Sequence, residues 1–372
     1  MFLSVYNPPN GSSTLNDLYK FMTDRVTSFE YTERWRKAGE FTLTLPFDDY
    51  FISKIRIGDI LYYDSYDCWL IAEGISYDYK RITIIGYDLK RILMYRVSTF
   101  SQSQETGTEG YDVVMGTTSE CIEHYLDNNF ISPEDSNRAV RMKFCGNDDI
   151  GLSIDTYMAR LEYVGDIIEY LCEHGEIGYR ISFENFSAAA GFVVRLEAAV
   201  DKSSRSSNHS TGPRVVFSAY RGNVTALKFD HDISNLLNAV YATGAGVTML
   251  VHRGDNVPQG LERRECAVDV NAPSVEDIST YALEQISENV ETNSYDITAA
   301  ASGYGTTYKI GDIVTVEEPE LNNAYHATIV EASISQSAGS LSVQITLGKS
   351  KMKLLDRITN NLINGTLGGR KK

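Results

Sequence analysis

The residues that could carry chemistry in this sequence are few, and they match no complete catalytic pattern. Gly348-Lys349-Ser350 resembles the end of a phosphate-binding loop, but that loop needs a glycine five residues before Gly348, where Val343 stands. Asp230-His231-Asp232 suggests metal binding or acid-base catalysis, yet adjacent side chains at a strand end point in different directions, which favours a turn. Neither His-Glu-x-x-His nor Gly-x-Ser-x-Gly occurs. We therefore predict no catalytic residue, no cofactor and no metal site.

The histidines and cysteines are also explained without catalysis. His124 and His174 lie near the ends of two predicted helices, where the helix dipole favours a cation. The cysteines are odd in number and never form a Cys-x-x-Cys pair, so the sequence predicts neither a disulfide framework nor a zinc site. We expect free thiols, most of them buried, in a protein made in a reducing cytoplasm. The five positions are Cys68, Cys121, Cys145, Cys172 and Cys266.

Length and composition indicate a folded chain of two to three domains. The chain has 372 residues and a net charge of −16, which argues against a surface that wraps nucleic acid. Its 24 tyrosines against 2 tryptophans favour half-buried strands. The first ten residues do not resemble a signal peptide, and no apolar run approaches the roughly 20 residues of a membrane span. We expect no stable membrane insertion.

The elements that position these residues begin with short strands. Aromatic and polar residues alternate from Phe29 to Trp35, and the alternation resumes from Phe41 to Leu45 after a Lys-Ala-Gly turn, which predicts a hairpin with one buried face. Further strands are expected at 60–63, 69–79 and 81–86. Close, short strands without long helices indicate an antiparallel barrel or sandwich. We assign residues 1–97 to this first module.

The middle of the chain mixes helices with strands. Thr117 and Glu120 form a capping-box pattern before one helix, and a second helix is expected from Val164 to His174. Strands follow at 178–183 and 192–196, and a polar stretch at 201–213 predicts a loop. We assign residues 98–232 to an α+β insertion.

The last third returns to strands around one acidic helix. A hairpin is predicted at 239–243 and 247–252, and a helix opens at Ser274 with an apolar stripe and an acidic, solvated face. We assign residues 233–348 to a second module. Residues 349–372 form a tail with seven basic residues and one acid, in which Leu354, Ile358 and Leu362 are spaced as on an amphipathic helix that docks on a partner; a frayed C-terminus is the alternative.

An internal repeat connects the first and last parts of the chain. Residues 57–60 and residues 310–313 both read Ile-Gly-Asp-Ile, and each copy precedes a strand. Downstream, 70–75 matches 329–334 in pattern, and 81–86 matches 340–348. We predict structural turns at Gly58-Asp59 and Gly311-Asp312 in two related antiparallel β-barrel modules, in a mainly β chain with an α+β insertion.

Several short segments in this order resemble siphophage and prophage tail proteins of the baseplate-hub family. The resemblance rests on an aromatic strand followed by Gly39-Glu40-Phe41-Thr42-Leu43, on an exit segment at 86–96, on an entry segment at 221–238 and on the late turn at 308–314. Each segment is short, and their shared order carries the resemblance across most of the chain.

The resemblance implies a structural role and a set of partners. It implies a homotrimeric hub at the distal tip of a virion tail, where six similar modules match a sixfold ring. The implied partners are the tail tube or distal tail protein, the tape-measure protein, and a spike, fibre or receptor-binding protein, with DNA as transient cargo in an acidic channel. Two alternatives for residues 98–232 remain open, a cell-wall hydrolase and a carbohydrate-binding module.

Overall fold

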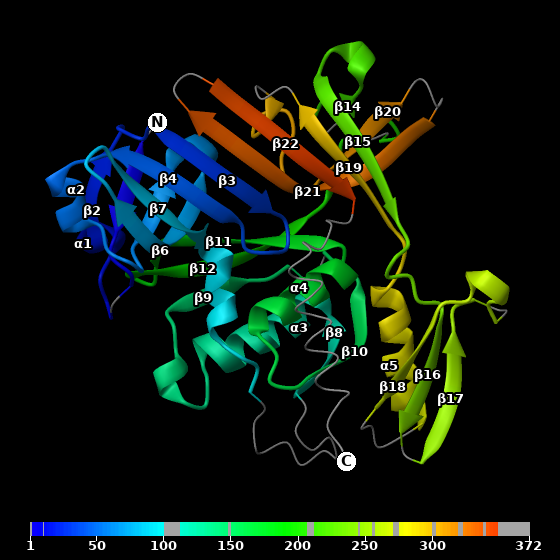
Figure 1. The fold of residues 1–372 in the computed structure, drawn as a ribbon. Coiled ribbons are helices and arrows are strands. Elements are labelled where there is room, and N and C mark those ends of the chain that lie inside the picture. Colours follow the sequence, from blue (N-terminus) through cyan, green and yellow to red (C-terminus); the bar gives the residue numbers. More distant parts are fainter. Residues whose placement is uncertain are drawn as a thin grey trace. The chain divides into compact units, whose positions relative to one another are not determined.

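The chain divides into two compact units in the computed structural model (Figure 1). The first comprises Met1–Leu227 and Asp296–Leu347, and the second contains Lys228–Tyr295. The structure describes residues 2–9, 11–99, 112–147, 150–206, 212–244, 246–254, 257–270, 275–299, 303–318, 323–337 and 340–348. The predicted docking residues Leu354, Ile358 and Leu362 lie outside the described residues.

The first module is a seven-stranded antiparallel part of a larger sheet. Its neighbour order is β3-β4-β7-β6-β5-β1-β2, with alternate side chains buried, as in β4, where Phe41, Leu43 and Leu45 point inward. Its elements are β1 (Leu3–Tyr6), α1 (Leu15–Leu18), β2 (Tyr19–Thr23), β3 (Ser28–Arg34), β4 (Glu40–Pro46), α2 (Asp49–Lys54), β5 (Ile60–Tyr63), β6 (Cys68–Tyr77) and β7 (Arg81–Asp88).

As the sheet defines it, the second module includes the strands between Val200 and Asp232, which the sequence assigned to the insertion, together with the strands after Thr292, and it repeats this strand order. Its neighbours run β15-β19-β22-β21-β20, so each strand matches one in the series β3-β4-β7-β6-β5. Two short strands, β13 and β14, pair with β20 where β1 pairs with β5. The elements are β13 (Val200–Asp201), β14 (Val216–Phe217), β15 (Val224–Asp232), β19 (Thr292–Ala299), β20 (Asp312–Glu318), β21 (Asn323–Ser337) and β22 (Ser340–Gly348).

The two modules join edge to edge in one 14-stranded sheet. Strand β21 pairs with β20 through its first half and with β3 through its second half, from Ser337 opposite Ser28 to Glu331 opposite Arg34. We call this β3–β21 pairing the seam. Neither module closes into the predicted barrel within the described residues, because β3 pairs with β21 of the second module and β15 pairs only with β19.

The α+β insertion packs two helices against small sheets. In Figure 1 it is coloured cyan to green, and helices α3 and α4 meet each other and α4 meets β11. A shared apolar core runs from Tyr125 and Leu171 of the insertion to Ile60 and Leu93 of the first module. The elements are β8 (Asp112–Thr117), α3 (Thr118–Leu126), β9 (Met142–Cys145), β10 (Ser153–Ala159), α4 (Val164–His174), β11 (Ile177–Phe186) and β12 (Ala189–Ala198).

The second unit is a small three-stranded sheet backed by one helix. Strand β16 pairs with β17 and β18, and Ile278, Ala282 and Ile286 of α5 are buried against it. Part of the acidic face predicted for α5 lies outside the described side chains. The elements are β16 (Ala239–Gly244), β17 (Val247–His252), β18 (Glu265–Asp269) and α5 (Val275–Glu288).

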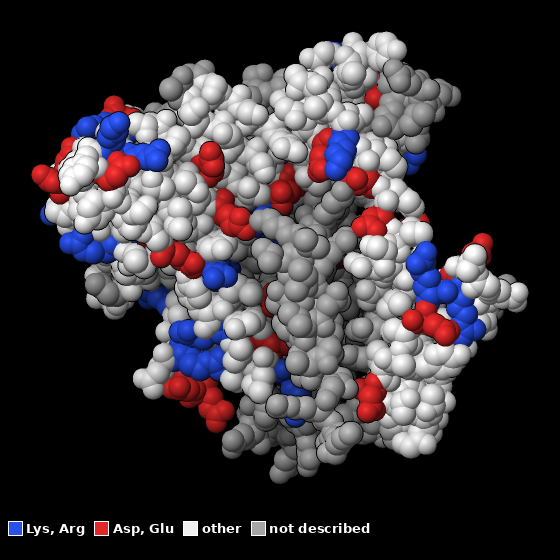
Figure 2. All heavy atoms as spheres, viewed as in Figure 1, with Lys and Arg blue, Asp and Glu red and all other residues white. Residues whose placement is uncertain are grey.

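Several local predictions are confirmed. The helix expected at 164–174 is α4, with those bounds, and Thr117 and Glu120 form both hydrogen bonds of a capping box before α3. The mainly β architecture with an α+β insertion is also confirmed. Within the described residues, no helix has the length and apolar character needed to cross a bilayer. On the face shown in Figure 2, acidic and basic side chains are interspersed over a largely uncharged surface.

Candidate functional site

The Gly58-Asp59 turn is built around a buried carboxylate. Gly58 adopts φ +89°, a conformation that glycine reaches without a steric penalty. The Asp59 side chain is almost fully buried and accepts a hydrogen bond of 2.8 Å from the backbone N–H of Arg56. Lys20 Nζ lies 2.7 Å from both carboxylate oxygens and also donates to the carbonyl of Lys54 at 3.1 Å. The turn is therefore closed by its own aspartate and anchored by a distant lysine.

The Gly311-Asp312 turn repeats this geometry in the second module. Gly311 has φ +84°, and the backbone N–H of Lys309 donates to Asp312 at 2.8 Å. Lys202 Nζ lies 2.8 Å from Asp312 and donates to the carbonyl of Thr307 at 3.1 Å. In both turns the lysine binds the carbonyl five positions before its aspartate. Two lysines from unrelated sequence contexts thus occupy equivalent places.

The strands after the turns carry equivalent irregularities. The Gly58 N–H donates to the Ala72 carbonyl at 2.7 Å, and the Gly311 N–H donates to the Ile329 carbonyl at 2.9 Å, so Ala72 and Ile329 are equivalent. The next residue in each strand is skipped in the pairing with β7 or β22, which places a bulge at the same position. The sequence match of 70–75 with 329–334 is therefore two residues out of register, because a pattern match cannot locate a hydrogen bond.

The side chain of Trp35 connects both modules with the insertion. Trp35 directly follows β3, is 2% exposed, and its backbone N–H donates to the Val330 carbonyl at 3.0 Å. A β-carbon on Gly178 of β11 would lie 1.9 Å from the indole Nε1, and one on Gly311 would lie 2.7 Å from the same atom. Two glycines therefore leave the space that this indole fills.

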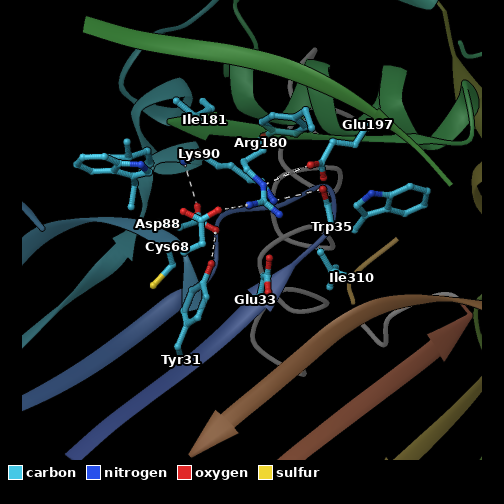
Figure 3. A pocket seen from close by; sticks show the side chains of 14 residues that line it. Tyr31, Glu33, Trp35, Cys68, Asp88, Lys90, Arg180, Ile181, Glu197 and Ile310 are labelled. Atoms are coloured by element: carbon cyan, nitrogen blue, oxygen red, sulfur yellow. Dashed lines mark hydrogen bonds and ion pairs between the residues drawn. The ribbon is translucent and has the colours of Figure 1, made fainter. Parts of the chain in front are cut away.

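A small charged cavity lies beside this indole, and its lining comes from all three parts of the first unit (Figure 3). Tyr31 donates to Asp88 at 3.2 Å, Arg180 lies 3.3 Å from Glu197, and Ile310 of the second module completes one wall. The cavity holds about 30 Å³, which is the space of roughly one water molecule. It has no room for a substrate.

Burial controls the ionisation of the groups around this cavity. Burial raises the pKa of Asp88, although the nearby Lys90 ammonium opposes that rise. Burial and the neighbouring Asp88 carboxylate raise the pKa of Tyr31 well above its ordinary value. The Lys90 ammonium donates to the carbonyls of Arg34 and Trp35, so it fixes the end of β3. These hydrogen bonds lie within the first module and hold β3 against the end of β7 and the segment that follows it.

The other residues that could carry chemistry do not come together. His124 lies 2.7 Å from the buried Asp112 and also contacts Asn128 and Tyr125, and His174 stacks on Tyr170. The three residues Asp230, His231 and Asp232 end strand β15, and Lys228 lies 2.8 Å from Asp230. All five cysteines are free thiols, and three of them are buried.

The regions that the structure describes contain no candidate metal site. There, no three His, Cys, Asp or Glu side chains gather in a way that could hold a metal ion. Three residues with structural roles were not predicted from the sequence: Lys20, Lys202 and Trp35. No sequence signal marks the two lysines, because each lies far along the chain from its aspartate, whereas the rarity of tryptophan gave a weak signal for Trp35.

Comparison with solved structures identifies the fold. The fold matches a 43 kDa prophage MuSo2 tail protein of Shewanella oneidensis with a TM-score of 0.54 and 13% identity, covering 93% of this chain and 97% of that one. It matches a prophage tail protein of Listeria monocytogenes with a TM-score of 0.54 and 10% identity, covering 98% and 100%. It matches a tail protein of Neisseria meningitidis with a TM-score of 0.54 and 13% identity, covering 94% of this chain and 97% of that one. The chain therefore has the fold of phage tail proteins.

The family is identified from the sequence match. A model of the family described as Siphovirus ReqiPepy6 Gp37-like protein matches residues 18–349, and the chain belongs to this family. No curated protein matches it. The predicted resemblance to siphophage and prophage tail proteins is confirmed.

Proposed function

We propose that this chain is a non-catalytic hub subunit at the distal tip of a siphovirus-type tail. The observation that carries this proposal is the repeated module: two turns with the same buried aspartate, the same lysine contact and the same bulge lie in one continuous sheet. Equivalent modules within one chain are useful where a ring needs more identical positions than there are subunits.

The repeat fits a homotrimer that presents six similar modules. Three copies would let a threefold assembly meet a sixfold tail tube or distal tail ring on one side. On the other side the same assembly would hold a spike, fibre or receptor-binding protein, and the tape-measure protein and DNA would use its axis. Membership in a siphovirus protein family and the shared tail-protein fold support this placement.

The charged cavity supports a structural role over a catalytic one. Its lining residues are bound to one another, and its volume of about 30 Å³ leaves no room for a glycan or peptide. Two further contacts cross between the parts: Arg180 of β11 lies 3.5 Å from Asp67 of the first module, and Tyr304 of the second module donates to Glu33 at 2.6 Å.

Gold labelling of purified tail particles tests the position. A peptide tag at the exposed loop around Leu261, which is 99% exposed, would carry the gold without disturbing the core. We expect one cluster of gold at the end of the tail farthest from the capsid. Gold along the whole tube, at the capsid end, or only on free protein would contradict the proposed function. An untagged particle serves as the control.

A further inference from the structure

The two modules differ at the edges where a neighbouring strand is expected. In the seam, the second half of β21 pairs with β3 on the side where its first half pairs with β20. Strand β6 is the counterpart of β21, and β5 pairs with it only from Cys68 to Ile71. Beyond the bulge, no described strand lies on that side of Gly74–Tyr77. In the described part of the chain, the first module therefore has no strand in the place that β3 takes beside the second module.

The uncovered edge is apolar, and its counterparts are buried. Ile57 in the first turn is 68% exposed, whereas Ile310, at the same place in the second turn, is 5% exposed. With the register set by Ala72 and Ile329, Tyr77 corresponds to Ile334, and their exposures are 63% and 1%. An exposed apolar strand edge favours pairing with another chain.

A groove lies along this edge. Its lining is mostly aliphatic and its volume is about 490 Å³. The turn beside it is also open, because a β-carbon on Gly58 would meet no atom within 4 Å, whereas one on Gly311 would meet Trp35 at 2.7 Å. The lining residues are Ile52, Ile55, Arg56, Ile57, Ile75, Tyr77 and Ile82.

The matching donor edge lies at the other end of the same sheet. Strand β15 is the counterpart of β3, but it is the last strand of the described sheet and pairs only with β19. Its first residues, Val224 to Leu227, are half-buried or exposed, whereas Phe29 and Tyr31 of β3 are buried. Among the described strands, the first module has no β3-like neighbour and β15 has no β21-like neighbour.

We propose that β15 of one copy pairs antiparallel with Gly74–Tyr77 of a second copy and covers the groove beside Ile57. The contact repeats the seam between chains, so it is continuous with a pairing already present within each chain. It joins different surfaces of the two copies and therefore propagates head to tail until a ring closes. The expected ring of three copies rests on the proposed function; the identity of the two edges rests on the repeat.

Substitution at the groove tests the surface. Ile57→Asp places a charge in the contact, and Met115→Asp, at a position in β8 with a similar exposure of 69%, is the matched control. We expect wild type and Met115→Asp to sediment as the same oligomer. The protein concentration below which the oligomer dissociates should be at least tenfold higher for Ile57→Asp than for wild type. Because Ile57 is exposed within one chain, the substitution should not lower the melting temperature of the monomer. An unchanged oligomer in Ile57→Asp, or a wild type that stays monomeric, overturns the proposal.

Cross-linking between two differently substituted chains tests the pairing itself. One chain carries Thr225→Cys and the other Tyr77→Cys, both in a background with Cys145→Ser and Cys266→Ser. A short bismaleimide should join the two chains when they are mixed, and a Met115→Cys chain mixed with Thr225→Cys should stay unjoined. The proposal is overturned if cross-linked products form only between two Tyr77→Cys chains and not between Tyr77→Cys and Thr225→Cys chains.

The two hypotheses fail separately. If the oligomer survives Ile57→Asp, the proposed contact is wrong, and the tail-tip position is still tested by the gold labelling. If the oligomer depends on Ile57 but the protein is found away from the tail tip, the contact is supported and the proposed function is wrong.

Discussion

Lys202 reaches Asp312 across 110 positions of sequence, with its Nζ 2.8 Å from a carboxylate whose side chain is fully buried. Replacing the lysine by methionine leaves that carboxylate in a buried site with only a backbone donor. Removal of one partner from a buried ion pair costs about 3 kcal/mol. We expect Lys202→Met to lower the free energy of unfolding by about this amount, measured by urea titration of Trp35 and Trp69 fluorescence.

The matched control is an ion pair on the surface of the same module. Arg221 lies 3.3 Å from Glu317, and both side chains are partly exposed. Because water screens such pairs, Arg221→Met should change the unfolding midpoint little. Equal losses in the two variants would contradict a special role for the buried pair.

The contact between Trp35 and Gly178 predicts a large effect from one methyl group. A β-carbon at Gly178 would lie 1.9 Å from the indole, so Gly178→Ala must displace a buried ring. Overpacking of this kind costs about 1–3 kcal/mol. Urea unfolding of the single variants and of Gly178→Ala combined with Trp35→Phe measures the coupling. The smaller ring should recover part of the loss, and strictly additive losses would exclude the contact as the cause.

Local sequence patterns predicted more of this structure than long-range ones. The capping box of Thr117 and Glu120 and the stripe of α4 involve residues a few positions apart, so their patterns determine the helices directly. Both copies of the repeat lie just before a strand that carries a bulge, and the register after the bulge is a feature that alternation cannot locate. The lysines that bind Asp59 and Asp312 come from distant segments, and only the fold brings them together.

Burial of Asp88 predicts a dependence of stability on pH. Its pKa is raised above the ordinary value of 3.8, so the folded state binds this proton more tightly than the unfolded chain. Its contribution to stability therefore falls as pH rises from the unfolded pKa through the folded pKa. Asp88→Asn removes the titratable carboxyl group and with it this pH-dependent contribution. We expect the stability of Asp88→Asn relative to wild type to increase from pH 3 to pH 7, measured by urea unfolding at each pH.

Glu184 provides the control of opposite sign. The Arg195 guanidinium hydrogen-bonds its carboxylate and lowers its pKa below 4.5, so its contribution is present above that pH and is lost as pH falls. The stability of Glu184→Gln relative to wild type should therefore decrease from pH 3 to pH 7. The same slope in both variants would show that the pH dependence comes from other groups.

The two equivalent glycines, Gly58 and Gly311, give the sharpest comparison between the modules. Alanine at either position pays for a positive φ, which costs roughly 1–2 kcal/mol. Only Gly311→Ala also drives a β-carbon to 2.7 Å from Trp35, so in the monomer it should be the more destabilising by about 1–3 kcal/mol. Urea unfolding at low protein concentration measures this gap, and equal losses would contradict the described difference between the turns. If another copy covers Gly58, its substitution should also weaken assembly, whereas Gly311→Ala acts within one chain and should affect mainly folding.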